Sequence, residues 1–272
     1  MKLAVCVQTP EINTTLPLAL FSGSFEQRLE KANRLGLAGI ELLVARPKEL
    51  NFREIKKQIR LAGLEIAAVA SGPIFMQDHL SLLSESAENS RLAEEQLGEL
   101  IELAASLESP LVTIGSFRGR LAWAAPDGVK RLTAVCSQAA ARAQRLGVRI
   151  VLEPLNRYET DFLHNAGEAL DFIASVGQAN LGLLLDTFHM NIEEVDIRTC
   201  VAQAMQSGRL WHVHLGDSNR LAPGLGHFDF AALVESLNQN SYNGYLSAEL
   251  LPRPDADIAA TLTIDYMHRL GV

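Results

Sequence analysis

The sequence predicts an α/β protein of the (β/α)8 TIM-barrel class, with a parallel eight-stranded sheet, formed as a single domain over residues 1–272. Short β-rich apolar runs alternate with longer helical patterns along the whole chain. Polar clusters follow at least four of these runs, at the ends where barrel enzymes gather their catalytic residues. A doubly wound open sheet shows the same alternation, but it would spread the clusters along a line. The clusters therefore favour the closed barrel.

Eight strands and eight helices are expected, with no linker or low-complexity tract that would mark a second domain. The expected strands are residues 3–8, 39–44, 65–70, 111–115, 149–154, 181–186, 211–216 and 245–250. The expected helices are residues 25–35, 52–62, 85–107, 126–146, 166–176, 193–207, 230–240 and 258–270.

Helix ends carry recognisable signals. Ser24 followed by Gln27 fits a capping box, in which each side chain binds the backbone amide of the other residue. Three helices finish alike, with Gly36, Gly63 and Gly147 placed just before an apolar strand. Glycine at this position suits a left-handed helix cap and a tight return into the sheet. The recurrence of this helix ending indicates a repeated βα unit.

The composition limits the classes of partner. The net charge of −8 comes from 24 basic and 32 acidic residues, which disfavours nucleic acid or an anionic membrane as the main partner. Cys6, Cys136 and Cys200 lie far apart in the sequence, so they are expected to be reduced and buried in a cytoplasmic protein. The N-terminal stretch MKLAVCVQTP is too weakly apolar for a signal peptide. No later segment approaches the roughly 20 apolar residues of a membrane span.

Four candidate metal ligands follow four successive strands. Glu153, Asp186, His214 and Glu249 each stand at the end of an apolar run in the second half of the chain. Three carboxylates and one imidazole suit a divalent ion such as Mn²⁺, Mg²⁺ or Co²⁺ better than a structural zinc. The alternative is four unrelated hydrogen-bonding residues at the barrel mouth, which would not account for their matching positions.

Further polar residues accompany these ligands. His212 lies two residues before His214 on a strand, so both point toward the barrel interior. His212 is either a second ligand or a hydrogen-bonded core histidine. His189 either reaches a substrate oxygen or only caps a loop. Glu41, at the end of the second strand, either faces the mouth or forms a buried salt bridge.

Arginines after two strands suggest an anionic group on the substrate. The stretch GSFRGR places Arg118 and Arg120 after the fourth strand, and Arg220 follows the seventh. The guanidinium fork suits carboxylate or phosphate groups, although solvated loop arginines are the alternative. The segment PGLGHFDF is a turn, because it lacks the lysine and the strand-to-helix context of a phosphate loop.

Two glutamates facing each other across a metal suggest proton transfer at carbon. A metal that binds a ketone oxygen and an adjacent hydroxyl stabilises the enediolate formed when the carbon-bound proton leaves. With Glu153 and Glu249 as the catalytic pair, one removes the proton from one face and the other returns a proton to the opposite face. This reaction is an epimerisation, and it needs no organic cofactor.

Four motifs are similar to those of a known family: EPLNRYETDF, LDTFHMNIEEV, HVHLGDSNRLAPGLGHFDF and SAELLP. They resemble the sugar isomerase and epimerase branch of the xylose-isomerase-like barrels, which includes the D-tagatose and D-psicose 3-epimerases. The match is dense over residues 151–252 and weaker before them. The resemblance implies that the four ligands hold the ion, that two of them form the acid/base pair, and that His212 is not a ligand. It also implies that Glu159, His189 and Arg220 contact substrate.

The GSFRGR stretch resembles the 5-keto-L-gluconate epimerases, which interconvert that keto acid with D-tagaturonate. Arg118 and Arg120 then imply an acidic substrate. The expected function is thus metal-dependent epimerisation of a sugar or sugar acid, either a ketose or a keto acid. Members of the group are commonly dimers or tetramers, so the resemblance also implies a homo-oligomer.

Three other functions compete with this expectation. An aldose–ketose isomerase of a sugar or sugar phosphate would use the same metal and glutamates. An endonuclease-like phosphodiesterase needs extra histidine ligands, and the first half of the chain has only His79. A non-catalytic sugar-binding barrel would be indicated by loss of Glu153 or Glu249, and both are present.

Overall fold

The computed structural model describes residues 1–124 and 126–272. Within them, eight parallel strands form a closed barrel in sequence order. The strands are β1 (Lys2–Gln8), β2 (Gly39–Leu43), β3 (Glu65–Ala70), β4 (Leu111–Ile114), β5 (Arg149–Leu152), β6 (Leu181–Asp186), β7 (Leu210–Leu215) and β8 (Tyr245–Ala248). Strand β8 returns to β1, where Leu246 pairs with Leu3. Because an open sheet would leave two unpaired edges, this closure confirms the predicted barrel and excludes the doubly wound alternative.

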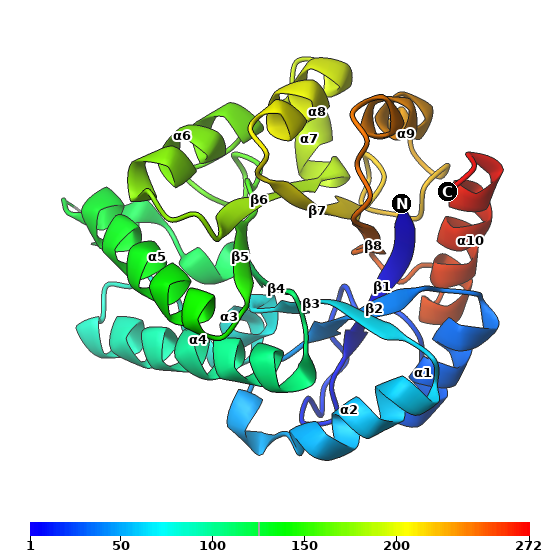
Figure 1. The fold of residues 1–272 in the computed structure, drawn as a ribbon, viewed down its shortest axis with the longest axis horizontal. Helices are drawn as coiled ribbons and strands as arrows, with labels where there is room; N and C mark the ends of the chain where they lie inside the picture. Colours follow the sequence, from blue (N-terminus) through cyan, green and yellow to red (C-terminus); the bar gives the residue numbers. More distant parts are fainter. Residues whose placement is uncertain (125) are drawn as a thin grey trace.

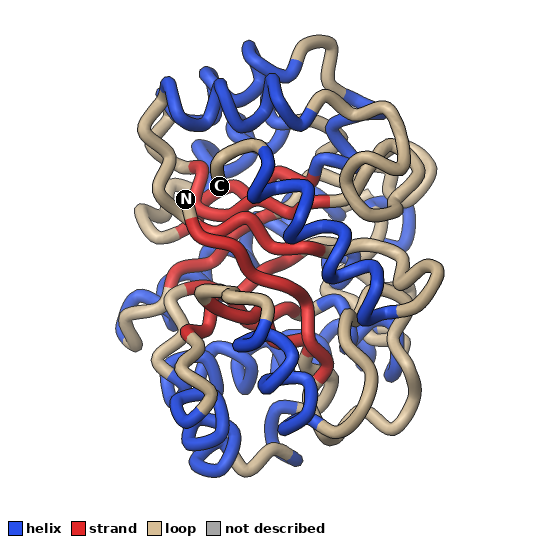
Figure 2. Tube along the Cα trace, turned by 90° about the vertical axis from the view of Figure 1, so that its right-hand side faces the viewer, coloured by secondary structure: helices blue, strands red, loops and turns tan. Residues whose placement is uncertain are grey.

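Helices surround the strands, as the view along the barrel and the side view show (Figures 1 and 2). The α-helices are α1 (Phe25–Arg34), α2 (Phe52–Leu61), α3 (Gly72–Asp78), α4 (Ala87–Leu107), α5 (Gly128–Arg145), α6 (Ala166–Val176), α7 (Thr187–Glu193), α8 (Ile197–Gln206), α9 (Phe230–Gln239) and α10 (Ala256–Arg269). Short 3-10 helices are η1 (Pro47–Glu49), η2 (Ser116–Arg118) and η3 (Leu121–Ala124).

The sequence did not predict α3 and α7, which follow β3 and β6 at the carboxyl ends of the strands. Each has only seven residues, too few to show a helical apolar period. The other α-helices all correspond to predicted ones. Helix α7 begins where the side chain of Asp186 accepts hydrogen bonds from the amides of Phe188 and His189. A residue predicted as a metal ligand is therefore also a helix N-cap.

The predicted helix signals are confirmed. Ser24 Oγ accepts from the Gln27 amide, while Gln27 Oε1 accepts from the Ser24 amide at 2.9 Å. Gly36, Gly63 and Gly147 have φ values of 71°, 69° and 72°. This left-handed conformation is open to glycine at no steric cost, so each helix turns back into the following strand.

Alternation along the strands divides the side chains between two environments. On β6, Leu183 and Leu185 belong to the large apolar core that the helices share. Leu184, between them, belongs to a small separate cluster with Ala68, Leu111 and Val151. Since neighbouring strand residues point to opposite faces, the second cluster lies inside the barrel. This apolar cluster lies in the barrel interior, next to the polar residues at the carboxyl ends of the strands.

Two features outside the site concern the cysteines and the helices. Cys6, Cys136 and Cys200 are free and buried. Over residues 1–124 and 126–272, no helix combines the length and the apolar character that crossing a bilayer requires.

Candidate active site

Four predicted side chains converge at the carboxyl ends of β5 to β8. Glu153 follows β5, Asp186 ends β6, His214 lies on β7 and Glu249 follows β8. One ligand atom from each lies within 4.8 Å of those of the other three. Strand register explains part of this convergence, because Asp186 pairs directly with His214. The barrel therefore assembles, from four strands, the group that the sequence singled out.

The ring nitrogens of His214 have different surroundings. Nδ1 lies 3.4 Å from Glu153 Oε1, 3.6 Å from Glu249 Oε2 and 3.8 Å from Asp186 Oδ2. Nε2 instead faces the carboxylate of Glu41 at 3.1 Å. The imidazole thus turns Nδ1 toward the three carboxylates and Nε2 away from them.

Several atoms of this cluster are buried and have no hydrogen-bond partner within the described residues. They are Glu153 Oε1, Asp186 Oδ2 and His214 Nδ1. Buried polar atoms in folded proteins are nearly always paired, so three such atoms converging on one point require an explanation. A divalent cation with a preference for oxygen ligands fits them, because it would accept a lone pair from each. The donor set suits Mn²⁺, Mg²⁺ or Co²⁺.

Burial of the carboxylates, and then the charges around them, shifts their pKa values. Burial, and then the charge of Glu153, raises the pKa of Asp186 to about 7. Burial also raises the pKa of Glu153. Burial would likewise raise the pKa of Glu249, but His214 and Arg220 lower it to about 2. Three carboxyl groups this close cannot all ionise without a compensating positive charge.

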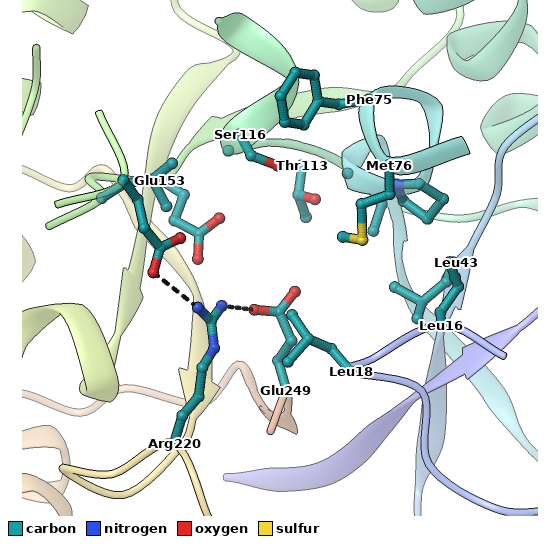
Figure 3. A pocket seen from close by; sticks show the side chains of 16 residues that line it. Leu16, Leu18, Leu43, Phe75, Met76, Thr113, Ser116, Glu153, Arg220 and Glu249 are labelled. Carbon is teal, nitrogen blue, oxygen red and sulfur yellow. Dashed lines mark hydrogen bonds and ion pairs between the residues drawn. The ribbon is translucent and has the colours of Figure 1, made fainter. Parts of the chain in front are cut away.

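Arg220 joins two glutamates at the edge of the cluster. Its Nη1 donates to Glu159 Oε1 at 3.0 Å and its Nη2 donates to Glu249 Oε2 at 3.2 Å. The guanidinium carbon also lies 4.8 Å from the centre of the Phe188 ring, a cation–π distance. Figure 3 shows Arg220 held at this polar end of a cavity, beside Glu249. Both glutamates are thereby fixed relative to each other.

Asp217 shapes the loop that carries Arg220. Its carboxylate accepts hydrogen bonds from the amides of Ser218, Gly224, Gly226 and Phe228, at 2.7 to 3.0 Å. A Cβ at Gly226 would overlap Asp217 Oδ1, so this close wrap requires glycine. Asp217 is thus the internal anchor of the loop and lies outside the cluster of Glu153, Asp186, His214 and Glu249.

His189 is oriented by Asn156. Its Nδ1 lies 3.3 Å from the backbone nitrogen of Asn156 and 2.8 Å from Nδ2 of the same residue. Both groups are donors, so Nδ1 accepts and the ring proton is on Nε2. Burial, and then Arg220, lowers the pKa of His189 well below its usual range. His189 is therefore a neutral imidazole whose buried Nε2–H has no hydrogen-bond partner among residues 1–124 and 126–272.

Glu41 and His212 lie inside the barrel, next to the candidate metal-binding cluster. Both are fully buried, and His212 Nε2 lies 2.8 Å from Glu41 Oε2. Glu41 therefore faces the barrel interior and does not line the mouth, and His212 is a hydrogen-bonded core histidine, one of the two predicted alternatives.

The structure contradicts the predicted role of Arg118. Its guanidinium is buried and donates to the backbone carbonyls of Gly115, Glu153, Phe162 and Leu163. These contacts occupy the fork that was expected to bind a substrate anion, and the side chain is not among those that line the cavity. Arg120 is also absent from the lining, and its Nη2 lies 3.4 Å from the carbonyl oxygen of Tyr158. Arg118 is therefore neither an anion receptor nor a solvated loop arginine, the two alternatives that the GSFRGR pattern offered.

A cavity of about 220 Å³ opens above the cluster. At one end it is lined by polar groups, which include Glu153, Glu159, Arg220, Glu249, Thr113 and Ser116. The remaining lining is largely apolar and includes Leu16, Leu18, Leu43, Pro73, Phe75 and Met76. In Figure 3, Leu16, Leu43 and Met76 form an apolar end across the cavity from Glu153 and Arg220. Sequence reasoning missed these apolar residues, because an apolar side chain facing a substrate has the same pattern as one facing the core.

Comparison with known proteins agrees with this geometry. Residues 29–266 match the xylose isomerase-like TIM barrel family. An L-ribulose 3-epimerase of Mesorhizobium japonicum is 33% identical over 227 residues, which cover 82% of this chain and 74% of that protein. The 3-dehydro-D-guloside 4-epimerase of Escherichia coli is 28% identical over 85% of this chain and 88% of that protein. A solved structure of an L-ribulose 3-epimerase superposes with a TM-score of 0.80, at 27% identity, covering 98% of this chain and 93% of that one.

These curated relatives are sugar epimerases, and the residues that the motifs predicted are brought together at one end of the barrel. The protein is accordingly an isomerase-class enzyme. The chain belongs to the xylose isomerase-like TIM barrel family, with homologues among the ketose 3-epimerases.

Proposed function

We propose that the protein is a metal-dependent epimerase that inverts C3 of a neutral ketose. The observation that carries this proposal is that two carboxylates, those of Glu153 and Glu249, belong both to a cluster that could hold a metal ion and to the lining of the cavity. Asp186 and His214 complete the donor set. A divalent ion bound there would supply positive charge to stabilise an enediolate.

In the proposed reaction, the carboxylate of one glutamate takes the C3 proton and becomes a carboxylic acid. The electrons of the broken C–H bond form the enediolate of the sugar. The second glutamate, initially protonated, delivers its proton to C3 from the opposite face and becomes a carboxylate. Atoms and charge balance over the cycle, and no redox cofactor takes part. Exchange with solvent returns both glutamates to their starting states.

Other residues of this chain would bind and orient the sugar. His189 is not among the residues that line the cavity, but its buried Nε2–H has no partner within the described residues and is proposed as a donor for a substrate oxygen. Arg220, which does line the cavity, holds Glu249 and Glu159 in place. Because hydrogen bonds already hold His189, Arg220 and the two glutamates in position, these side chains need little reorganisation before proton transfer.

The apolar end of the cavity favours a neutral substrate over a keto acid. Arg220 is the only cation among the described lining residues, and two glutamates already bind it. A carboxylate or phosphate placed beside Leu16, Leu18 and Met76 would lose water without gaining a partner. The substrate carbons distant from C3 are therefore proposed to lie against Leu16, Leu18 and Met76.

Proton NMR in D₂O tests the proposal. Metal-stripped protein, reloaded with Mn²⁺ or Mg²⁺ for the reaction, is incubated with ketoses, keto acids and ketose phosphates, and paramagnetic ions are removed before recording. Metal-dependent loss of the H3 signal of a neutral ketose, with growth of its C3 epimer, is the expected result. An aldose product would indicate an isomerase, and exchange at C4 of a 3-keto sugar would indicate a 4-epimerase. A clear preference for keto acids would contradict the proposed substrate class, and no exchange in any member would contradict the activity.

The enzyme is also proposed to work in the cytoplasm as a single-domain barrel, as its free, buried thiols would suggest. A dimer or tetramer remains the expected assembly, and sedimentation velocity would measure it.

A further inference from the structure

Glu41 is an ionisable side chain in the closed interior of the barrel. It lies on β2, is fully buried, and pairs in register with Cys6 of β1. Its carboxylate reaches across the interior to β7, where His212 and His214 lie 171 and 173 residues further along the chain. A buried charge is costly unless it is paired. The two imidazoles of His212 and His214 are the groups that pair with this buried carboxylate.

The contacts determine which ring nitrogen of His214 carries the proton. Oε1 and Oε2 of Glu41 lie 3.2 Å and 3.1 Å from Nε2 of His214. An ionised carboxylate only accepts hydrogen bonds, so Nε2 must donate. In the neutral imidazole, a proton on Nε2 leaves a lone pair on Nδ1. Nδ1 is the nitrogen that faces Glu153, Asp186 and Glu249.

The opposite tautomer would place a proton where a cation needs a lone pair. Ligand histidines commonly donate their second ring N–H to a carboxylate, which fixes the ring and increases its basicity. Building on the proposed metal site, we infer that Glu41 is a positioning residue for His214, holding it with Nδ1 ready to bind the cation. Glu41 contacts neither the substrate cavity nor the three ligand carboxylates in the described structure.

Glu41→Gln tests this role with little change of shape. Replacing one carboxylate oxygen by an amide NH₂ group introduces a donor that faces the imidazoles. That donor favours His214 with Nε2 as the acceptor and the proton on Nδ1, which opposes metal binding. The expected result is a 10- to 100-fold weaker affinity for Mn²⁺, the usual effect of removing such a partner.

Titration of metal-stripped protein with Mn²⁺ alone, followed by the EPR signal of the free ion, measures this affinity without any assay of turnover. Circular dichroism and urea unfolding of the same samples report the fold. His212→Gln is the matched control, because it disturbs the same buried network but keeps the bond between Glu41 and His214. Its Mn²⁺ affinity is expected to stay close to the wild-type value even if its stability falls. Glu41→Asp retains the charge but withdraws the carboxylate by one methylene, so its affinity should lie between those of the wild type and Glu41→Gln.

Wild-type Mn²⁺ affinity in folded Glu41→Gln or Glu41→Asp would overturn the inference. An equal loss of Mn²⁺ affinity in His212→Gln would also overturn it, because the effect would then come from general disturbance of the core. These results would leave the proposed epimerase intact. Failure of the wild-type protein to bind Mn²⁺ would instead overturn the metal site itself, and the inference with it.

Discussion

Nη1 of Arg118 donates a hydrogen bond to the backbone carbonyl oxygen of Glu153 at 2.7 Å. The same guanidinium also reaches the carbonyls of Phe162 and Leu163 in the loop after β5. Arg118 is thus a cross-link between two loops at the barrel mouth, and it fixes the backbone of one proposed catalytic glutamate. The sequence predicted that Arg118 binds an anion, whereas in the structure it stabilises two loops.

Arg118→Met is expected to destabilise the protein, because several buried carbonyls lose their donor. The loss should be about 2–4 kcal/mol of unfolding free energy, measured by urea denaturation. Arg120→Met, two residues away and half-buried, should change stability by less than about 0.5 kcal/mol. A stable Arg118→Met enzyme with a selectively raised KM for acidic substrates would restore the anion-binding role.

The two proposed proton carriers can be distinguished by their substrates. Glu153→Gln and Glu249→Gln should each reduce epimerisation by about 10²–10⁴-fold, because either change removes one member of the acid/base pair. Each variant keeps one base, so each should exchange the C3 proton of only one of the two epimers with D₂O. Proton NMR of each variant with each epimer makes this comparison, with the metal content measured in parallel. Exchange of both epimers by the same variant would exclude a two-base mechanism.

A cation placed at the apolar end of the cavity should change the substrate preference. Met76→Lys introduces an ammonium group where a keto acid or ketose phosphate would place its anion. The ratio of kcat/KM for an anionic to a neutral ketose should rise about tenfold, the value of one charge-assisted hydrogen bond. Met76→Leu conserves volume and should keep the wild-type ratio. If Met76→Lys leaves the ratio unchanged while it remains folded, the distal part of the substrate does not lie at this end.

Asp217 should give the protein an acid-sensitive contribution to stability. Burial alone would raise the pKa of this carboxyl group, but hydrogen bonds from four backbone amides lower it below its usual value. A lowered folded-state pKa stabilises the folded protein above the unfolded-state pKa of about 3.9, and this contribution disappears as the pH falls through the folded-state value.

Asp217→Asn should therefore cost about 1–3 kcal/mol at pH 7, and the difference from wild type should shrink below about pH 4. Urea unfolding of the wild type and of Asp217→Asn between pH 7 and pH 3 measures this difference in unfolding free energy. A difference that does not depend on pH would mean that the loop needs the shape of the side chain and not its charge.

The order of elements and the location of the site could be predicted from local sequence patterns. The period of the apolar residues indicated the strands and most helices, and the glycine caps marked where chains turn back. Glu153, Asp186, His214 and Glu249 were identified because each follows an apolar run, and the carboxyl ends of parallel strands meet at one end of a barrel. Their convergence is a consequence of topology, which the alternation of elements already specifies.

Only the tertiary structure decided what the remaining polar residues bind. Three of the four carbonyl acceptors of Arg118 lie 35 to 45 residues away in the sequence, and the histidine partners of Glu41 lie more than 170 residues away. The apolar wall at Leu16 and Met76 likewise faces a cavity rather than the core. Periodicity is a local property, whereas a hydrogen-bond partner or a cavity wall is set by which distant elements pack together. That is why the four clustered residues could be predicted from the sequence, while the contacts of Arg118 and the apolar part of the cavity could not.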